Sequence, residues 1–272
     1  MGKGRPFLEV FTCALSEDHW FPILELLVLL CALWTFFTAG IAGVSGSYSD
    51  FITVEAFTHN LVFSFTWPLI IMVGIPIVKN IAYGLGSDVE KGIVQTLVLY
   101  PLTRGYILTA RLLSALVIPL LLFLGISIFG LFLYFPDVIL ANPGTVALTY
   151  AAQISPLLLT AGLLLLLALR LRRGVPTLLA GLTLCFILFV IFDSIADSIA
   201  WGTGSDWSLK IYAVITPNLA LQEYYLGTLL GFTHRIWVPS FSEVLLYLLA
   251  GYLLVAVVFI IGYVYFKRRL RI

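Results

Sequence analysis

Two carboxylates lie inside one of the most apolar stretches of this chain. Asp193 and Asp197 are four residues apart, so they share one face of any helix that contains them. A charge at the middle of a bilayer costs at least about 2.5 kcal/mol, so such residues usually face a cavity or a partner. Two interpretations stay open: the pair lines the outer exit of a substrate pathway, or both side chains reach headgroups and water. A metal site is disfavoured, because no His or Cys stands beside them.

A serine nucleophile is the second chemistry that the sequence suggests. Residues 43–46 read Gly-Val-Ser-Gly and match the short serine motif of rhomboid-type intramembrane proteases. A serine needs a base within hydrogen-bond reach, and we expect all three histidines, His19, His59 and His234, to fall outside the membrane spans. We therefore interpret the motif as a turn and expect no catalytic residue. The chain also has no P-loop motif, so it is not expected to bind ATP phosphates itself.

Residues 87–101 interrupt the apolar chain with a polar and apolar pattern at helical spacing. Ser87 followed by Glu90 is a capping box, which predicts a helix that starts at Ser87. Pro101 disfavours helix at the residue before it, so the predicted helix ends after about three turns. A short amphipathic helix between two spans belongs at the membrane surface, with or without a protein partner.

The same stretch carries a resemblance to a known family. Its elements are Glu90-Lys91-Gly92-Ile93, then Leu97, then Pro101-Leu102-Thr103-Arg104, and later the basic residue Arg111. This pattern resembles the loop between the second and third spans of type-two ABC exporter permeases. That loop usually carries an acidic-basic-x-Gly-Thr motif, a Leu-rich turn, Pro-x-Ser-Arg and a later Lys. Ile93, Thr103 and Arg111 stand where Thr, Ser and Lys are usual.

The resemblance implies that residues 87–101 form a coupling helix, which docks into a separate ATP-hydrolysing subunit. It implies a role for each of five residues: Glu90 as cap and polar contact, Gly92 for close approach, Leu97 as an apolar contact, Pro101 as the stop, and Arg104 as an anchor to headgroups or to the ATPase. It also implies the partners, namely a cytoplasmic ABC ATPase subunit that binds ATP and Mg, and a second permease copy as a homodimer or with a paralogue.

Composition independently indicates a polytopic membrane protein. The chain has 272 residues, of which 61% are hydrophobic and 11% charged, against about 25% charged in soluble proteins. A helical span needs roughly 20 apolar residues. We expect an all-α fold with six transmembrane helices, at about 21–41, 61–81, 107–135, 146–169, 175–200 and 244–266.

The distribution of basic residues predicts the orientation. Of the 15 Lys and Arg residues, all except Lys210 and Arg235 fall on one side of the six expected spans. Under the positive-inside rule, both termini and residues 87–101 are therefore expected in the cytoplasm. The basic residues at the end of the chain are expected to face anionic lipid rather than nucleic acid.

Two further segments are expected to hold helices outside the spans. Residues 1–20 mix charged and apolar side chains without a signal-peptide cleavage site, and favour an interfacial helix over a partly ordered tail. Residues 201–243 are too long for a plain loop, and Pro217–Leu226 is typical of a short helix with Pro at its start. By resemblance, this outer segment contains short or re-entrant helices.

These expectations together indicate the permease subunit of an ATP-driven ABC exporter, in a single transmembrane domain over residues 1–272. The alternative is a membrane scaffold that assembles a secreted or lipid-linked pathway without transporting anything. The cargo is not encoded in any motif of the sequence.

Overall fold

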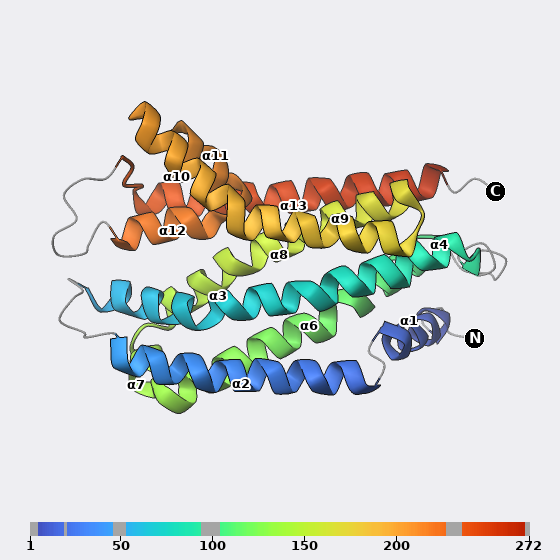
Figure 1. The fold of residues 1–272 in the computed structure, drawn as a ribbon, viewed down its shortest axis with the longest axis horizontal. Helices are drawn as coiled ribbons and strands as arrows, with labels where there is room; N and C mark the ends of the chain where they lie inside the picture. The colour runs from blue at the N-terminus through green and yellow to red at the C-terminus, as the bar shows by residue number, and fades with distance from the viewer. Residues whose placement is uncertain (1–4, 19–20, 46–52, 94–103, 227–235, 270–272) are drawn as a thin grey trace.

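The computed structural model describes residues 5–18, 21–45, 53–93, 104–226 and 236–269, and the elements in these ranges are all helical (Figure 1). The α-helices are α1 (Arg5–Asp18), α2 (Phe21–Ser45), α3 (Val54–Ile81), α4 (Asp88–Glu90), α6 (Arg104–Tyr134), α7 (Pro136–Ala141), α8 (Pro143–Leu171), α9 (Gly174–Phe186), α10 (Phe192–Thr203), α11 (Trp207–Ile215), α12 (Pro217–Leu226) and α13 (Phe241–Arg269). Two π-helical segments, η2 (Ala82–Ser87) and η3 (Ile187–Ile191), join α3 to α4 and α9 to α10.

Five of the described helical stretches are long and apolar enough to cross a membrane. They are Val54–Glu90, Gly105–Tyr134, Pro143–Leu171, Gly174–Thr203 and Phe241–Arg268. The chain is therefore a multi-pass membrane protein, as its composition predicts. The first expected span coincides with α2, whose described apolar part is limited to Leu26–Thr38, so the sixth crossing stays a prediction.

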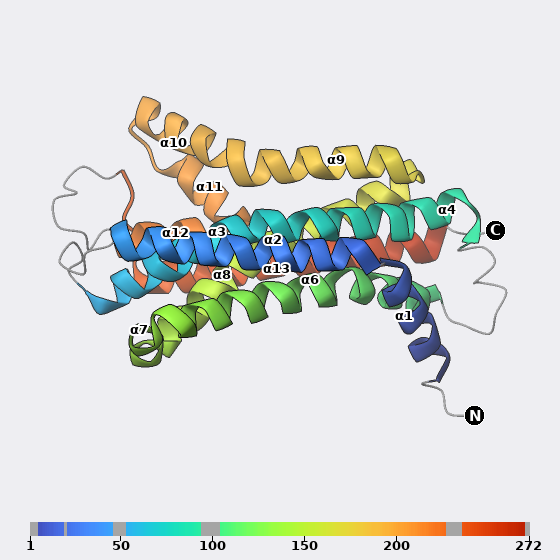
Figure 2. The same ribbon diagram turned by 60° about the horizontal axis from the view of Figure 1, so that its bottom comes forward.

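The long helices run side by side and give the molecule two distinct ends. Helix α1, helix α4 and the C-terminal end of α13 lie at one end, which we call the α4 end (Figure 1). Helices α7, α10 and α12 lie at the opposite end, which we call the α12 end (Figures 1 and 2). The short helices α11 and α12 fall within residues 201–243, and α12 has the bounds Pro217–Leu226.

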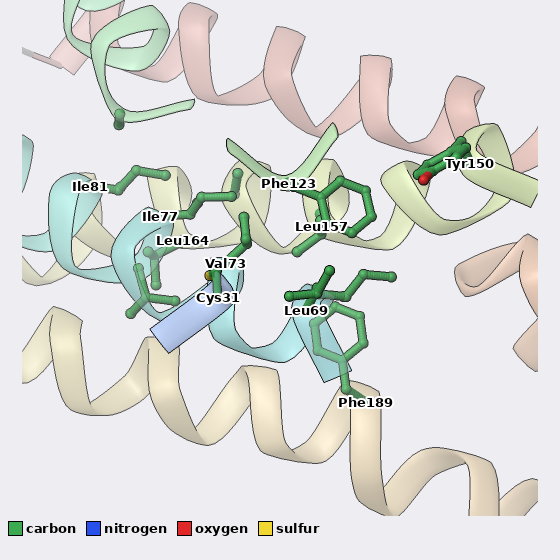
Figure 3. Close-up of a cluster of buried hydrophobic side chains, with 14 of the residues drawn as sticks. Cys31, Leu69, Val73, Ile77, Ile81, Phe123, Tyr150, Leu157, Leu164 and Phe189 are labelled. Atoms are coloured by element: carbon green, nitrogen blue, oxygen red, sulfur yellow. The ribbon is translucent and has the colours of Figure 1, made fainter. Parts of the chain in front are cut away.

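Helices α3 and α8 form the centre of the bundle. They are the most buried of the candidate spans, whereas α6, α9 and α13 turn most of their apolar surface outward. Leu69, Val73 and Ile77 of α3 pack in one cluster with Leu157 and Leu164 of α8 (Figure 3). Close packing of large side chains at full burial makes this pair the core of the fold.

The predicted helix start at Ser87 is wrong. A capping serine needs an extended backbone, but Ser87 has φ −70° and ψ −38° and its side chain makes no capping hydrogen bond. Helix α3 instead continues through η2 into α4, because η2 packs against α9 and buries Leu85 and Gly86 there. The chain leaves the helix at Gly92, whose φ of 74° is the left-handed conformation typical of glycine at a helix end.

The expectation that all three histidines fall outside the spans is wrong for His59. The hydroxyl of Thr53 accepts a hydrogen bond from the backbone N–H of Ala56 at 3.2 Å, which caps α3 several residues before the apolar run begins. His59 consequently lies within α3 and is 3% exposed. His19 and His234 lie outside the described residues.

Gly130 allows α6 to approach its neighbours closely. A Cβ atom at this position would lie 2.5 Å from Thr35 Cγ2 on α2 and 2.6 Å from Phe65 Cζ on α3. We predict that Gly130→Ala lowers the free energy of unfolding by about 1–3 kcal/mol, because the three helices must separate. Gly125→Ala is the matched control on the same helix, since nothing lies within 4 Å of its Cβ position. Thermal unfolding in detergent checks this, and equal melting temperatures for the two variants would contradict it.

Candidate functional site

A buried ion pair at the α4 end joins three helices. Arg111 of α6 is 7% exposed, and its Nη2 lies 2.5 Å from Oδ2 of Asp88 on α4, which is also buried. Its Nη1 lies 2.6 Å from Oε2 of Glu17 on α1, which is half exposed. A planar guanidinium has several donors in fixed directions, so one arginine can hold two carboxylates from different elements.

Further polar contacts attach the end of α1 to the same region. Ser114 Oγ, one turn along α6 from Arg111, donates a short hydrogen bond to the Asp18 carboxylate. Lys79 Nζ on α3 donates to the backbone carbonyl of Asp18 at 2.6 Å. We call Glu17, Asp18, Lys79, Asp88, Arg111 and Ser114 the Arg111 cluster. It fixes α1 to α3 and α6, beside α4.

Glu90 connects the same segment to a fourth helix. Its Oε2 accepts a hydrogen bond from the backbone N–H of Gly174 at 3.1 Å, at the first residue of α9. The first N–H groups of a helix have no partner within it, and a negative charge there also favours the helix dipole. Glu90 therefore caps α9, whereas the sequence predicts a cap on its own helix at Ser87.

The structure describes only three of the five residues for which the resemblance implies a coupling role. Glu90 is exposed and ends α4, and Gly92 follows it with a positive φ that ends the helix. The predicted role of Gly92 in close approach stays a prediction. Arg104 is the first residue of α6. Leu97 and Pro101 lie outside the described residues, so their predicted roles, and the predicted helix over residues 94–101, stay predictions.

A second group of polar residues lies in the half of the bundle nearer the α12 end. His59 Nδ1 on α3 lies 3.0 Å from Thr149 Oγ1 on α8, and the imidazole stacks on the ring of Tyr225 with centroids 4.9 Å apart. Further along the same two helices, Thr66 Oγ1 of α3 lies 2.5 Å from Gln153 Oε1 of α8. Buried polar groups in an apolar bundle are costly unless they pair, so these contacts fix how α3 and α8 face each other.

A cavity of about 200 Å³ opens beside the second pair. Helices α3, α8, α10, α11 and α12, and the residue between the last two, line the cavity. The lining residues are Phe63, Trp67, Ile70, Gln153, Pro156, Asp193, Tyr212, Thr216, Asn218, Leu219 and Gln222. Burial raises the pKa of the Tyr212 phenol to about 12. The phenol is protonated at neutral pH, as an ordinary tyrosine is, and its hydroxyl donates to the backbone carbonyl of Leu188 at 3.1 Å.

The two carboxylates that the sequence pairs lie on one helix, and only one of them lines the cavity. Asp193 and Asp197 are both exposed on α10, one turn apart. Asp193 is among the described residues that line the cavity, and Asp197 is not. The π-helical segment η3 ends immediately before α10, which carries Asp193. π-Helical segments often occur at functional positions.

Most residues of the Arg111 cluster and of the cavity were not predicted from the sequence. Arg111 enters the family resemblance only as a basic residue, and its acidic partner Glu17 is 94 positions away in the chain. No spacing rule predicts such a pair. Gln153 and Asn218 were also missed, although an amide inside an apolar run, as at Gln153, is itself a signal of a polar site.

The buried ion pair leads to a stability prediction. Arg111→Met leaves the buried Asp88 carboxylate without its partner, so we expect the free energy of unfolding to fall by about 3–5 kcal/mol. Lys210→Met is the control, because it breaks the partly exposed Lys210–Asp206 pair and should shift the melting temperature far less. Thermal unfolding in detergent measures both, and a shift for Arg111→Met no larger than the control's would show that the buried pair contributes little.

Comparison with known proteins assigns no family. No protein-family model matches the chain, and no curated protein sequence is significantly similar to it.

Proposed function

We propose that this chain is the membrane-spanning permease subunit of an ATP-driven ABC exporter. In this proposal residues 87–101, of which the structure describes 87–93, form the coupling segment that docks into a cytoplasmic ATPase subunit, which binds ATP and Mg. The observation that carries the proposal is the connection of this segment to three other helices: Asp88 to Arg111 of α6, through Arg111 to Glu17 of α1, and Glu90 to the start of α9.

Those connections suit the transmission of force. Removing one partner of a buried ion pair costs about 3–5 kcal/mol, so α4 and α6 should move together rather than separate under load. Helix α3 continues unbroken through η2 into α4, which gives a single helical stretch from Val54 to Glu90. A displacement of α4 therefore reaches the α12 end through α3, as expected for rigid-body switching.

The orientation in this proposal follows from charge and from the fold together. Most Lys and Arg residues fall on the side of the spans that holds residues 87–101. Helix α1, helix α4 and the C-terminal end of α13 share one end of the bundle (Figure 1). We propose that the α4 end faces the cytoplasm, where ATP is, and that α2 supplies the sixth span.

The outward faces of this chain offer a surface against which a second copy of the permease, identical or paralogous, can pack. Helix α13 exposes Leu246, Leu249, Leu253 and Ile260 along one side. Lipid covers such a surface equally well, because helix association in membranes depends on close packing rather than on apolarity. The same outward faces fit the alternative function, a membrane scaffold without transport, so ATP coupling is what distinguishes the two.

The test combines the permease with the ABC ATPase encoded beside it or copurified with it. We expect the wild-type complex to assemble and hydrolyse ATP. We expect the double variant Glu90→Ala with Leu97→Asp to weaken assembly by roughly tenfold or more. The first change removes a polar contact, and the second places a charge in an apolar contact. Copurification and the ATPase rate measure this.

The matched control makes the same two changes at the opposite end. Asp137→Ala with Leu140→Asp alters an exposed acid and an exposed leucine of α7, and should leave assembly and the ATPase rate unchanged. If no ATPase binds the wild type, or if both double variants behave alike, the coupling assignment fails and the scaffold function is favoured.

A further inference from the structure

The cavity near the α12 end contains polar groups without partners. Gln153 is 1% exposed, and its Oε1 contacts Thr66 while its Nε2 has no hydrogen-bond partner among the described residues. Asn218 is 5% exposed, and its Oδ1 likewise has none among them. An unpaired buried polar group costs about 1–3 kcal/mol. Both residues line the same cavity. A rotation of their amide groups toward it would let a ligand there satisfy one free donor and one free acceptor.

The hydroxyl groups of the cavity add acceptors rather than donors. Thr216 Oγ1 donates its hydrogen to the backbone carbonyl of Tyr212 at 3.0 Å, and the Tyr212 hydroxyl donates to the carbonyl of Leu188 at 3.1 Å. Each hydroxyl oxygen keeps lone pairs but has no second hydrogen to give. These two hydroxyl oxygens and Asn218 Oδ1 therefore offer acceptors to a ligand.

The charge and the aromatic walls of the cavity favour a cation. Asp193 supplies a carboxylate, and no Lys or Arg is among the described residues that line the cavity. Phe63, Trp67 and Tyr212 contribute three aromatic rings, and ring faces attract ammonium groups within about 6 Å. Asp197 lies one turn along the same helix and adds to the negative potential.

From these observations we infer that the cavity is a binding site for a small ammonium ion that also carries an oxygen acceptor, as in ethanolamine or choline. The ammonium group faces Asp193 and the aromatic rings, and the ligand's oxygen accepts from Gln153 Nε2. Asn218 Oδ1 accepts from the hydroxyl of choline or from an N–H of ethanolamine. The volume of about 200 Å³ is below the roughly 300–1,000 Å³ of sites for drug-sized molecules, which limits the ligand to a group of this size. Such a group is supplied either by a free amino alcohol or by the headgroup of a lipid.

This site goes beyond the proposed permease function and does not depend on it, because binding requires neither an ATPase nor transport. The experiment is equilibrium binding of radiolabelled choline to the full chain in nanodiscs of phosphatidylglycerol, at constant ionic strength. We expect saturable binding by the wild type. Asp193→Asn should raise the Kd by about tenfold or more, since it removes the one carboxylate among the described lining residues.

Two controls separate charge recognition from general effects. Asp197→Asn removes a carboxylate on the same helix that does not line the cavity, and should change the Kd by less than about threefold. The neutral analogue of choline, with carbon in place of nitrogen, should not compete with choline on the wild type, a comparison that needs no variant.

The lipid composition of the nanodisc identifies the source of the ammonium group. If phosphatidylethanolamine added to the nanodisc weakens choline binding by the wild type, the headgroup occupies the site; if it has no effect, the ligand is a free amine. Either result supports the site. Absence of saturable choline binding, an unchanged Kd in Asp193→Asn, or equal competition by the neutral analogue would overturn the inference.

Discussion

A guanidinium buried at the end of a membrane bundle must be surrounded by carboxylates, and the α4 end of this protein is arranged to meet that need. Removing a charged group from water costs several kcal/mol, which is repaid only with close and complementary partners. Arg111 obtains these partners from α1 and α4, at 2.6 Å to Glu17 and 2.5 Å to Asp88. Helix α1, which has no apolar span of its own, is thereby held against α6 and α3.

The two polar sites lie on one continuous element. Helix α3 carries His59 and Thr66, which pair with α8 near the cavity, and it continues through η2 to Asp88 in the Arg111 cluster. Helices with close-packed interfaces shift between discrete positions rather than deform continuously. If the chain is a permease, this helix connects the proposed ATPase contact at one end with the proposed ammonium site at the other, and a bound ligand would favour one of two positions of α3.

The sequence was sufficient to predict elements whose signal lies within one segment and outweighs the packing around it. Long apolar runs predicted six spans, five of which coincide with long apolar helices of the structure, and Pro217 predicted the start of α12, because length and proline geometry act within one segment. The capping box at Ser87 failed, since packing of η2 on α9 kept the chain helical past a local start signal. The Arg111 cluster and the cavity could not be predicted, because their residues come from distant segments that only the packed bundle brings together.

The most direct test of this structure is a double-mutant cycle on Arg111 and Asp88. The measurement is the free energy of unfolding in detergent for Arg111→Met, Asp88→Leu and the variant with both changes. We expect the double variant to be more stable than Arg111→Met, with an interaction energy within the roughly 0.5–3 kcal/mol found for contacting residues, because no buried carboxylate is then left unpaired. Additive effects of the two changes would mean that Arg111 and Asp88 do not interact, and that α4 is not fixed to α6 as described.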